Sequence, residues 1–452
     1  MPTGERARGR AIMGILCAFA IAVAWGVAAP SARADALFTY GLAPSSISVA
    51  NAAVAWGRGY DACYLNPAAM TFETRPLAGA GYLYADANLR ATHAPDPEYD
   101  ATQGLSLGAT IPLPFRGALR NRIAFGVGFF FPNGVVLDLL VPYPTEPQYV
   151  LQQNAGRSLA AVSALSILPI RGVAIGGGTQ FYDNTSGQID ATVDAAGRVD
   201  ATVGEELTTT FSPIAGLILS PAAWFEAMPD VRLAFVFRDK FATTYEIPVN
   251  SYIGDIPLEV GIRATSLYTP RHYVVGFAHV APRWTAEIDA IHFEWSKYPD
   301  PNLDIQAEFT IPILPISFQD SQSIDPDFHD TTSVRAGGEW TFVSRDRWDA
   351  RARAGYAWEP SPVPAQTGET NYLDGDRHVG AAGVAIGWRD ADGRASRVDV
   401  GGQYHAVVPR KFQKNSGVDA DNPGYPKLGV GGALWAAGVS FTASFDIEGI
   451  AP

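Results

Sequence analysis

The stretch Val334-Arg-Ala-Gly-Gly-Glu-Trp-Thr-Phe342 (VRAGGEWTF) decides the fold class. Its even positions carry Val, Ala, Gly, Trp and Phe, whereas its odd positions carry Arg, Gly, Glu and Thr. Successive residues of a β-strand lie on opposite faces of the sheet. The stretch therefore predicts a strand with one apolar face, aromatic toward one end, and one face that is small or charged.

The same alternation recurs along the chain, for example in 232–238, 351–358 and 397–406. A soluble β-sandwich also alternates, but its apolar face points inward. Two observations favour a transmembrane barrel instead. The apolar faces carry Trp, Tyr and Phe near the segment ends, as aromatic girdles at membrane interfaces do. The N-terminal leader described below also sends the chain to the compartment where such barrels are found. Separately, no apolar run after the leader reaches 18 residues, which excludes membrane-spanning helices.

We expect an all-β fold, a transmembrane antiparallel β-barrel of about 14 strands, because bacterial single-chain barrels have an even number. The alternation fails in 284–296, where the polar phase of Glu287 and Asp289 continues into Ile291, Phe293 and Trp295. We interpret this as the strand leaving the bilayer. Long connections near 139–157, 184–208, 297–330 and 409–430 are Pro-rich and acidic, and are expected to be extracellular loops. The expected strands lie near 77–90, 103–112, 121–138, 158–169, 172–183, 209–219, 231–247, 257–280, 284–296, 332–343, 350–359, 378–389, 396–408 and 432–445.

The N-terminus has the features of a secretory signal peptide. Three Arg residues at positions 6, 8 and 10 precede an apolar run over 11–29, and Ala32-Arg-Ala34 offers a small-x-small cleavage site. An uncleaved anchor helix is the alternative, but Pro30 would break it. We therefore expect residues 1–34 to be a cleaved signal peptide and the remainder to be exported to the outer membrane of a Gram-negative bacterium.

Residues 35–76 do not alternate, and their side chains are mostly small. They leave room for one or two short helices but for no spanning strand, so they could hang in the periplasm or lie inside the lumen. Their small side chains and lack of net charge suit a packed interior, so we expect a hatch (plug) inside the lumen. Residues 77–447 would then form the barrel and 448–452 a short tail. Outer-membrane barrels usually end on an aromatic residue, and this chain departs from that pattern by running past Phe445 to DIEGIAP.

Composition excludes several classes of function. The formal net charge of −13 argues against a nucleic-acid partner, which would need a basic patch. Of the two cysteines, Cys17 lies in the leader, so Cys63 has no intramolecular partner. The seven His residues are scattered and no nucleophile motif is present, so we expect no enzyme, no metal site and no cofactor. Asp419 and Asp421 are interpreted as a solvated acidic loop, with a calcium site as the alternative.

Several stretches, in order, resemble the FadL-type outer-membrane transporters of long-chain fatty acids or aromatic hydrocarbons. The first is Asn66-Pro67-Ala68, which is similar to the family's hatch tripeptide, although Asn-Pro is also a general turn signal. The next are TAEIDAIHFEWS (285–296) and the strand that follows Asp330. The most specific is Ser361-Pro-Val-Pro364 after a Gly-aromatic strand, followed by Asp374-Gly-Asp-Arg377. The family-signature positions are Trp295, Asp330, Ser361, Pro362, Pro364, Asp376 and Arg377.

The resemblance implies a monomeric barrel of fourteen strands with a hatch and with a kinked third strand that opens a lateral path into the bilayer. Ligand-gated movement of the hatch would let a hydrophobic small molecule pass down its gradient, in contact with outer-membrane lipid and lipopolysaccharide. The hatch candidates are Asn66, Pro67 and Ala68, together with the new N-terminus that runs from Asp35 to Phe38. The kink candidates are Phe131, Pro132, Asn133 and Gly134, where proline and glycine weaken a β-ladder; the alternative is that the strand ends there in a turn.

Arg263, Arg335 and Arg353 are tentative pocket residues, because a luminal Arg can bind a fatty-acid carboxylate by charge-assisted hydrogen bonds. The alternative is that these residues pair with luminal acids such as Glu287, Glu339 or Asp399. Fatty-acid members of the family tend to have basic residues where this chain has Ile189 and Ile324. Long-chain fatty acids remain the first expectation, and neutral or aromatic hydrocarbons the alternative.

Two other functions remain open. A general porin or adhesin barrel would need no hatch, so residues 35–76 count against it. A lipid hydrolase of the outer membrane would need Ser, His and an acidic residue together on the lumen or rim, and no stretch of the sequence predicts that arrangement.

Overall fold

A computed structural model describes residues 36–92, 101–133, 145–153, 159–193, 199–225, 228–253, 256–299, 304–311, 314–319 and 325–446. Within these ranges no helix is long and apolar enough to span a bilayer. The helical elements are α2 (Ala36–Thr39), α3 (Pro44–Ile47), α4 (Ala62–Leu65), η1 (Pro67–Phe72), η2 (Gly117–Leu119), α5 (Val150–Gln153), η3 (Pro221–Ala223) and η4 (Trp295–Lys297).

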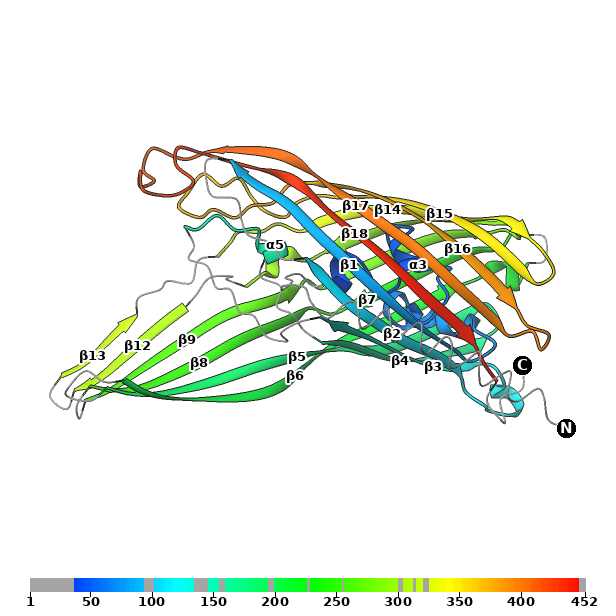
Figure 1. Cartoon of the computed structure of the whole chain (residues 1–452), viewed down its shortest axis with the longest axis horizontal. Coiled ribbons are helices and arrows are strands. Elements are labelled where there is room, and N and C mark those ends of the chain that lie inside the picture. The colour runs from blue at the N-terminus through cyan, green and yellow to red at the C-terminus, as the bar shows by residue number, and fades with distance from the viewer. Residues whose placement is uncertain are drawn as a thin grey trace.

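Fourteen antiparallel strands among the described residues close into a barrel (Figure 1). Neighbours in the sheet follow chain order, and β1 pairs with β18 from Leu77 opposite Ser444 to Thr92 opposite Gly429. This pairing removes the free edge of the sheet, and the predicted barrel is confirmed. The strands are β1 (Leu77–Thr92), β2 (Thr102–Pro112), β3 (Ile123–Pro132), β4 (Ala160–Ile170), β5 (Val173–Val193), β6 (Val199–Leu219), β7 (Val231–Arg238), β10 (His272–Val280), β11 (Trp284–Phe293), β14 (Thr331–Ser344), β15 (Trp348–Glu359), β16 (Arg377–Arg389), β17 (Ala395–Gln413) and β18 (Lys427–Ser444).

The two faces of the barrel strands differ as the sequence predicted. On β15, Tyr356 and Trp358 are exposed on the outer face while Arg353 is buried on the inner face. Trp348 and Trp358 lie ten residues apart on this strand, which corresponds to about 33 Å along the strand. A tilt of about 40° reduces this to roughly the 25 Å height of the apolar band of outer-membrane barrels. The outward aromatic residues therefore delimit the membrane-spanning band.

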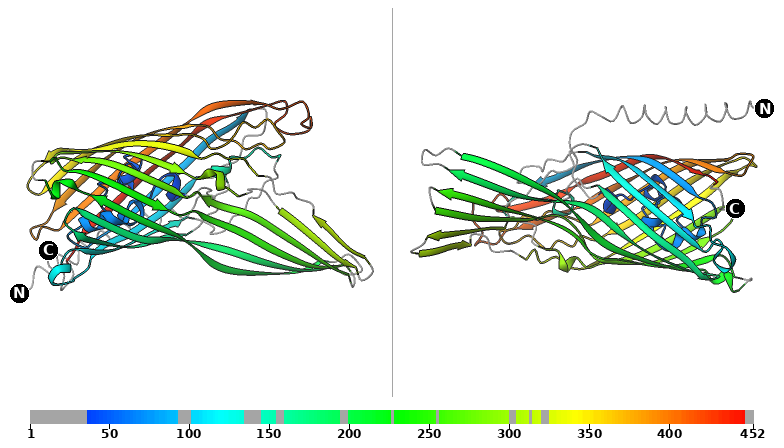
Figure 2. Two further views of the ribbon diagram at one scale, coloured as in Figure 1. Left: turned by 180° about the vertical axis from the view of Figure 1, so that it is seen from behind. Right: turned by 90° about the horizontal axis from the view of Figure 1, so that it is seen from below.

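The barrel continues on one side into a sheet that the sequence did not predict. β5 and β6 are 21 residues each, about twice the length that a bilayer requires. Beyond the barrel, β5 pairs with β8 (Phe241–Ile253), β8 with β9 (Ile256–Thr269), β9 with β12 (Asp304–Ile311), and β12 with β13 (Leu314–Gln319). Figures 1 and 2 show this extension projecting from the end of the barrel away from the C-terminus.

The extension explains where the predicted boundaries were wrong. Segments 184–208 and 297–330, expected to be loops, contain the far halves of β5 and β6 and the β12–β13 hairpin. Segments 231–247 and 257–280, expected to be single strands, are each divided. β7 ends at Arg238, and the Asp239 amide then bonds the Pro213 carbonyl at 3.0 Å. Pro270, which has no N–H to donate, separates β9 from β10.

Residues 36–76, called the N-terminal segment below, lie inside the barrel, with α3 and its neighbours (blue) enclosed by the strands in both Figure 1 and Figure 2. Most of its apolar side chains belong to one buried cluster with the inner faces of the strands. Gly126 and Gly128 on β3 make room for it, because a Cβ at either position would meet Met70, Cys63 or Leu42. Small residues on the inner face of β3 thus accommodate the N-terminal segment.

Candidate functional site

The candidate site is an aromatic pocket in the lumen that is filled by a side chain of the N-terminal segment. Phe38, on α2, packs edge-on against His272, Phe293 and Trp295, with ring-centroid distances of 6.1, 5.7 and 6.2 Å. His272 opens β10, Phe293 closes β11 and Trp295 opens η4. These four residues are called the aromatic pocket below; edge-to-face geometry is the favoured arrangement of such rings.

Two small cavities flank the Phe38 ring. One, of about 30 Å³, is bounded by Trp295, Arg335, Glu359, Pro362 and Arg377 among others. The second, of about 50 Å³, is bounded by Leu37, Tyr64, Arg238, His272 and Asp289 among others. Phe38, Phe293 and Arg335 line both cavities, so withdrawal of Phe38 would join them into one pocket.

The first cavity has an ion-paired rim. Arg335 donates to Glu359 at 3.1 Å, and Arg377 approaches the other oxygen of Glu359 at 3.4 Å. Arg335 was predicted as a pocket residue, and the structure places it at the pocket. The predicted alternative, that Arg335 pairs with a luminal acid, also applies, because Glu359 lies at one edge of the Arg335 guanidinium.

Two polar side chains at or near the second cavity were not predicted from the sequence as pocket residues: Arg238, which lines it, and Glu287, which lies beside it on β11 two residues before Asp289. Arg238 donates to the Tyr64 carbonyl and stacks over the Tyr64 ring at 4.2 Å. Glu287 accepts hydrogen bonds from the amides of Ala55 at 2.9 Å and Trp56 at 3.2 Å. Glu287 on β11 therefore ties the N-terminal segment to the barrel.

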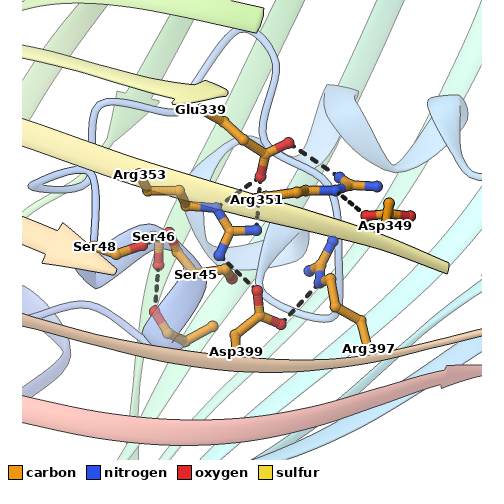
Figure 3. Close-up of polar contacts among 10 residues, drawn as sticks. Ser45, Ser46, Ser48, Glu339, Asp349, Arg351, Arg353, Arg397 and Asp399 are labelled. Atoms are coloured by element: carbon orange, nitrogen blue, oxygen red, sulfur yellow. Dashed lines mark hydrogen bonds and ion pairs between the residues drawn. The ribbon is translucent and has the colours of Figure 1, made fainter. Parts of the chain in front are cut away.

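Arg353 lies elsewhere, in a polar network shown in Figure 3, near the end of the barrel at which β10 turns into β11. It bonds Glu339 at 2.7 Å and Asp399 at 2.6 Å, and Arg397 bonds Asp399 at 2.8 Å. Arg351 joins the network through Glu339 at 3.0 Å. Arg353 is thus paired with luminal acids and does not line the aromatic pocket. It borders a separate cavity of about 280 Å³.

Arg263, the third predicted pocket residue, lies on β9 in the extension, where its backbone is opposite Asp304 of β12. Its position outside the barrel strands separates it from the aromatic pocket. Ile189, noted because family members tend to be basic there, is on the far half of β5 opposite Val203 of β6. Ile324 falls outside the described residues.

The family-signature residues lie around the aromatic pocket and brace the connections above it. Trp295 and Pro362 line its first cavity. Asp330 accepts the Ser296 amide at 2.8 Å, and Asp376 accepts the Ser361 amide at 2.9 Å. Each bond joins two chain segments at the end of the barrel opposite the termini. Pro364 follows in the same connection, and its carbonyl accepts a hydrogen bond from Gln366 at 3.1 Å.

The predicted hatch tripeptide forms a turn that fits the barrel closely. The Asn66 side chain caps η1, accepting the Ala68 amide at 3.0 Å and donating to the Val54 carbonyl at 2.8 Å. A Cβ on Gly216 of β6 would meet Asn66, and one on Gly176 of β5 would meet Pro67 and Ala68. Burial raises the pKa of the Cys63 thiol to about 12, so this cysteine is an unreactive packing residue. Asp35 lies outside the described residues.

At the predicted kink, β3 stays paired through its last residue. Phe131 is opposite Leu105 and Pro132 opposite Gly104 of β2, with no shift of register in this ladder. The Asn133 amide donates to the Gln103 carbonyl at 2.8 Å, and its side chain donates to the Tyr82 hydroxyl at 3.0 Å. Gly134 falls outside the described residues, so a lateral opening there stays a prediction.

Ile291, Phe293 and Trp295 are buried and continue the luminal phase of Glu287 and Asp289, where they build the aromatic pocket. That the strand leaves the bilayer here stays a prediction. The apolar residues that continue a luminal phase were therefore the signal in the sequence for the aromatic pocket. His272 and Arg238 were missed because each begins or ends a strand that the sequence did not divide correctly.

Comparisons with known proteins agree with the sequence resemblance. A family model described as outer membrane protein transport protein (OMPP1/FadL/TodX) matches residues 265–445. A long-chain fatty acid transport protein of Salmonella typhi is 22% identical over 421 residues, covering 84% of this chain and 87% of the relative. Alkane uptake protein A of Marinobacter nauticus is 22% identical over 404 residues, covering 83% and 84%. These relatives are transport proteins rather than enzymes.

The fold is also similar to solved structures. The crystal structure of a Pseudomonas aeruginosa FadL homologue aligns with a TM-score of 0.57 at 15% identity, covering 92% of this chain and 100% of that chain. The predicted resemblance to the FadL-type family is therefore confirmed in sequence over the C-terminal part of the barrel and in fold over nearly the whole chain.

Proposed function

We propose that this chain is an outer-membrane transport protein of the OMPP1/FadL/TodX type, which carries hydrophobic small molecules into a Gram-negative bacterium. The observation that carries the proposal is the position of Phe38, which places an aromatic ring of the N-terminal segment in a pocket inside a closed barrel. A lumen filled in this way suits apolar ligands and not water-borne solutes. Burial of apolar surface at about 25 cal/mol per Å² makes capture favourable without an energy source.

A series of buried aromatic side chains supports a path to the pocket from the extracellular end. Tyr372 contacts Phe328 at 5.9 Å, Phe328 contacts Tyr298 at 5.0 Å, and Tyr298 contacts Trp295 at 6.0 Å between ring centroids. Short turns connect the strands at the opposite end, as periplasmic turns do. The series therefore leads an apolar ligand from the extracellular connections down to Phe38.

Gating would come from Phe38, near the beginning of the N-terminal segment. The Asn66–Ala68 turn fits closely against Gly176 and Gly216, whereas the Phe38 ring lies between two small cavities that a ligand could enlarge. A ligand that competes for the aromatic pocket would displace Phe38 and leave the turn in place. The hatch then consists of a fixed part at Asn66–Ala68 and a movable part at Phe38.

Exit would occur laterally at the end of β3, near Phe131–Gly134, into the outer leaflet. The support is the β3–β4 ladder, which ends at Phe130 opposite Ala160, two residues before the end of β3, together with the small residues on the inner face of β3. Replacing Gly134 with Val and measuring uptake tests this route. Unchanged uptake by a folded barrel would exclude it.

Long-chain fatty acids and neutral hydrocarbons are both candidate substrates. The printed names of relatives include each class, a fatty acid transport protein and an alkane uptake protein. One observation favours a neutral ligand: the guanidinium of Arg335 at the pocket is already paired with Glu359. We further propose that the barrel acts as a monomer surrounded by outer-membrane lipid and lipopolysaccharide.

Reconstitution tests the function. Compounds extracted from the purified barrel are identified by mass spectrometry, and proteoliposomes are assayed for uptake of a hydrophobic probe and for leakage of small sugars. We expect apolar compounds to co-purify and sugars to be retained. Rapid, size-limited leakage of sugars would contradict the proposal and identify a general porin.

A further inference from the structure

The cavity beside Phe38 contains a buried carboxyl group that no amide, hydroxyl or cationic group of the described chain binds. Asp289, on β11, is 1% exposed, and its polar neighbour is the carboxyl of Glu287. A proton shared with Glu287 satisfies one oxygen of Asp289 and leaves the other without a partner among the described residues. The neighbouring carboxyl of Glu287 also lies against Gly276 and is itself an acceptor for two amides of the N-terminal segment. A buried polar group without a partner is costly, so Asp289 points to a ligand that supplies a donor.

Unused donors line the same cavity. The Nε atoms of Arg238 and Arg335 have no hydrogen-bond partner among the described residues, and both residues line the cavity together with Asp289. Arg335 is directly opposite Asp289 in the β11–β14 ladder. The cavity therefore presents an acceptor and donors to one ligand, which a hydroxyl group can satisfy because it both donates and accepts.

The ring of Phe38 indicates the shape of the rest of the ligand. A benzyl group fills the aromatic pocket in edge-on contact with three rings. The cavities of about 30 and 50 Å³ on its two sides have room for small substituents. A single aromatic ring with one polar group fits the space that Phe38 and the second cavity occupy together.

A carboxylate fits less well than a hydroxyl. It would bring a negative charge beside Asp289 and Glu287, and it has no proton to donate to Asp289. Arg335, the cation on the β-strand opposite Asp289, already shares its charge with Glu359 at 3.1 Å. The lack of a proton to donate to Asp289 is therefore what disfavours a carboxylate at this site.

We propose, on the premise of the transport function above, that this site binds neutral aromatic compounds that carry a hydroxyl group. The ring replaces that of Phe38, and the hydroxyl donates to Asp289 while accepting from Arg238 or Arg335. Asp289 is then the residue that selects the ligand's polar group.

Three para-methyl probes of similar shape test the selectivity of the unaltered protein. The detergent-solubilised full chain is titrated at pH 7 with p-cresol, p-xylene and p-toluate by calorimetry. We expect p-cresol to bind about tenfold more tightly than p-xylene, a factor within the range of one hydrogen bond, and p-toluate to bind most weakly. Equal binding of p-cresol and p-xylene, or preference for p-toluate, overturns the proposal.

Variants assign the preference to one residue. Asp289→Leu should lower p-cresol affinity to the level of p-xylene and leave p-xylene affinity at least as high. Asp346→Asn, an exposed carboxylate on the turn between β14 and β15, is the matched control and should keep the preference. If the Leu variant does not fold, Asp289→Asn should fold and reduce the preference several-fold. A preference kept in the folded Asp289 variants overturns the proposal.

The outcome also separates this inference from the transport function. Saturable binding of p-xylene or p-toluate without preference for p-cresol refutes only the role of Asp289. If none of the probes binds, the inference about an aromatic ligand fails, and the transport function is then decided by the proteoliposome assay alone.

Discussion

Glu287 is the single side chain that most clearly couples the barrel to the N-terminal segment. Its two carboxyl oxygens accept the Ala55 and Trp56 amides, and the residue is 4% exposed. Few side chains of a strand bind two consecutive backbone amides of another segment, so this contact fixes the height of the segment in the lumen.

Replacing Glu287 with Ala should loosen the N-terminal segment by about 1 to 3 kcal/mol, because two buried amides lose their acceptor. The measurement is single-channel conductance in planar bilayers, where we expect more frequent open events. Glu287→Gln is the matched control, since its amide oxygen can still accept one of the bonds and should preserve most of the closed time. Identical conductance of the Ala variant and the unaltered protein would contradict this role.

At the scale of elements, the fit between η1 and the barrel depends on two glycines that lie next to it. A Cβ on Gly216 would meet the Asn66 side chain, and a Cβ on Gly176 would meet Pro67 and Ala68. The sequence marks these glycines only as small luminal positions of two strands. The turn and the strands are therefore complementary in shape as well as in polarity.

Gly216→Val should displace the Asn66 turn and allow small sugars to leak from proteoliposomes. Gly177→Val is the matched control, because position 177 lies on the outer face. A Cβ added there would come no closer than 3.8 Å to the Ile214 carbonyl oxygen. Leakage should rise in the first variant and stay at background in the second. Equal leakage of the two variants would show that the turn is not held by this contact.

Cys63 reports whether the whole N-terminal segment leaves the lumen. It is fully buried, and burial raises the pKa of its thiol to about 12, so the reactive thiolate is scarce at any pH below that value. We expect maleimide labelling at pH 7 to be slow both without ligand and with saturating ligand, and fast after denaturation. Rapid labelling on addition of ligand would mean that the Asn66 turn moves together with Phe38.

At the scale of the whole molecule, the extension is separate from the closure of the barrel. β12 and β13 pair only with each other and with β9 among the described strands, whereas the fourteen barrel pairings form a complete ring without them. The strands β12 and β13 of the extension therefore contribute no pairing to the closed ring of the barrel.

Replacing residues 304–319 by a short Gly-Ser linker should leave the barrel folded, since no barrel pairing is lost. Folding is measured by heat-modifiable migration in SDS gels. Deleting the barrel strands β15 and β16 instead should abolish the folded band, because the ring could no longer close in register. Loss of the folded band in the first variant would show that the extension is part of the folding unit.

The sequence predicted the barrel well because strand alternation is a local signal. Residues such as Trp340 and Arg335 reveal their faces from their immediate neighbours alone. The extension was missed because its strands continue barrel strands beyond the membrane, where neither face has to be lipid-compatible. The division at Pro270 was missed for a related reason, since alternation resumes on either side of it.

The candidate site was predicted only in part. Phe38 and Arg335 were selected from the sequence, and the structure brings them to one pocket. Asp289, His272 and Phe293 were not selected as pocket residues, because their role depends on where Phe38 of the N-terminal segment packs inside the lumen. Arg353 was selected only because alternation along its strand puts it on the luminal face. Alternation does not say how far along the barrel axis a side chain lies.

The central claim is that Phe38 occupies the space that a hydrophobic ligand takes. The most direct test is the affinity of p-xylene for Phe38→Ala, measured by calorimetry beside the unaltered protein and the lipid-facing control Phe342→Ala. Without the Phe38 ring the aromatic pocket is open to ligand at all times, so the apparent affinity of the protein for p-xylene should rise. The account predicts binding about tenfold tighter in Phe38→Ala and unchanged in Phe342→Ala. Unchanged or weaker binding in Phe38→Ala would contradict it.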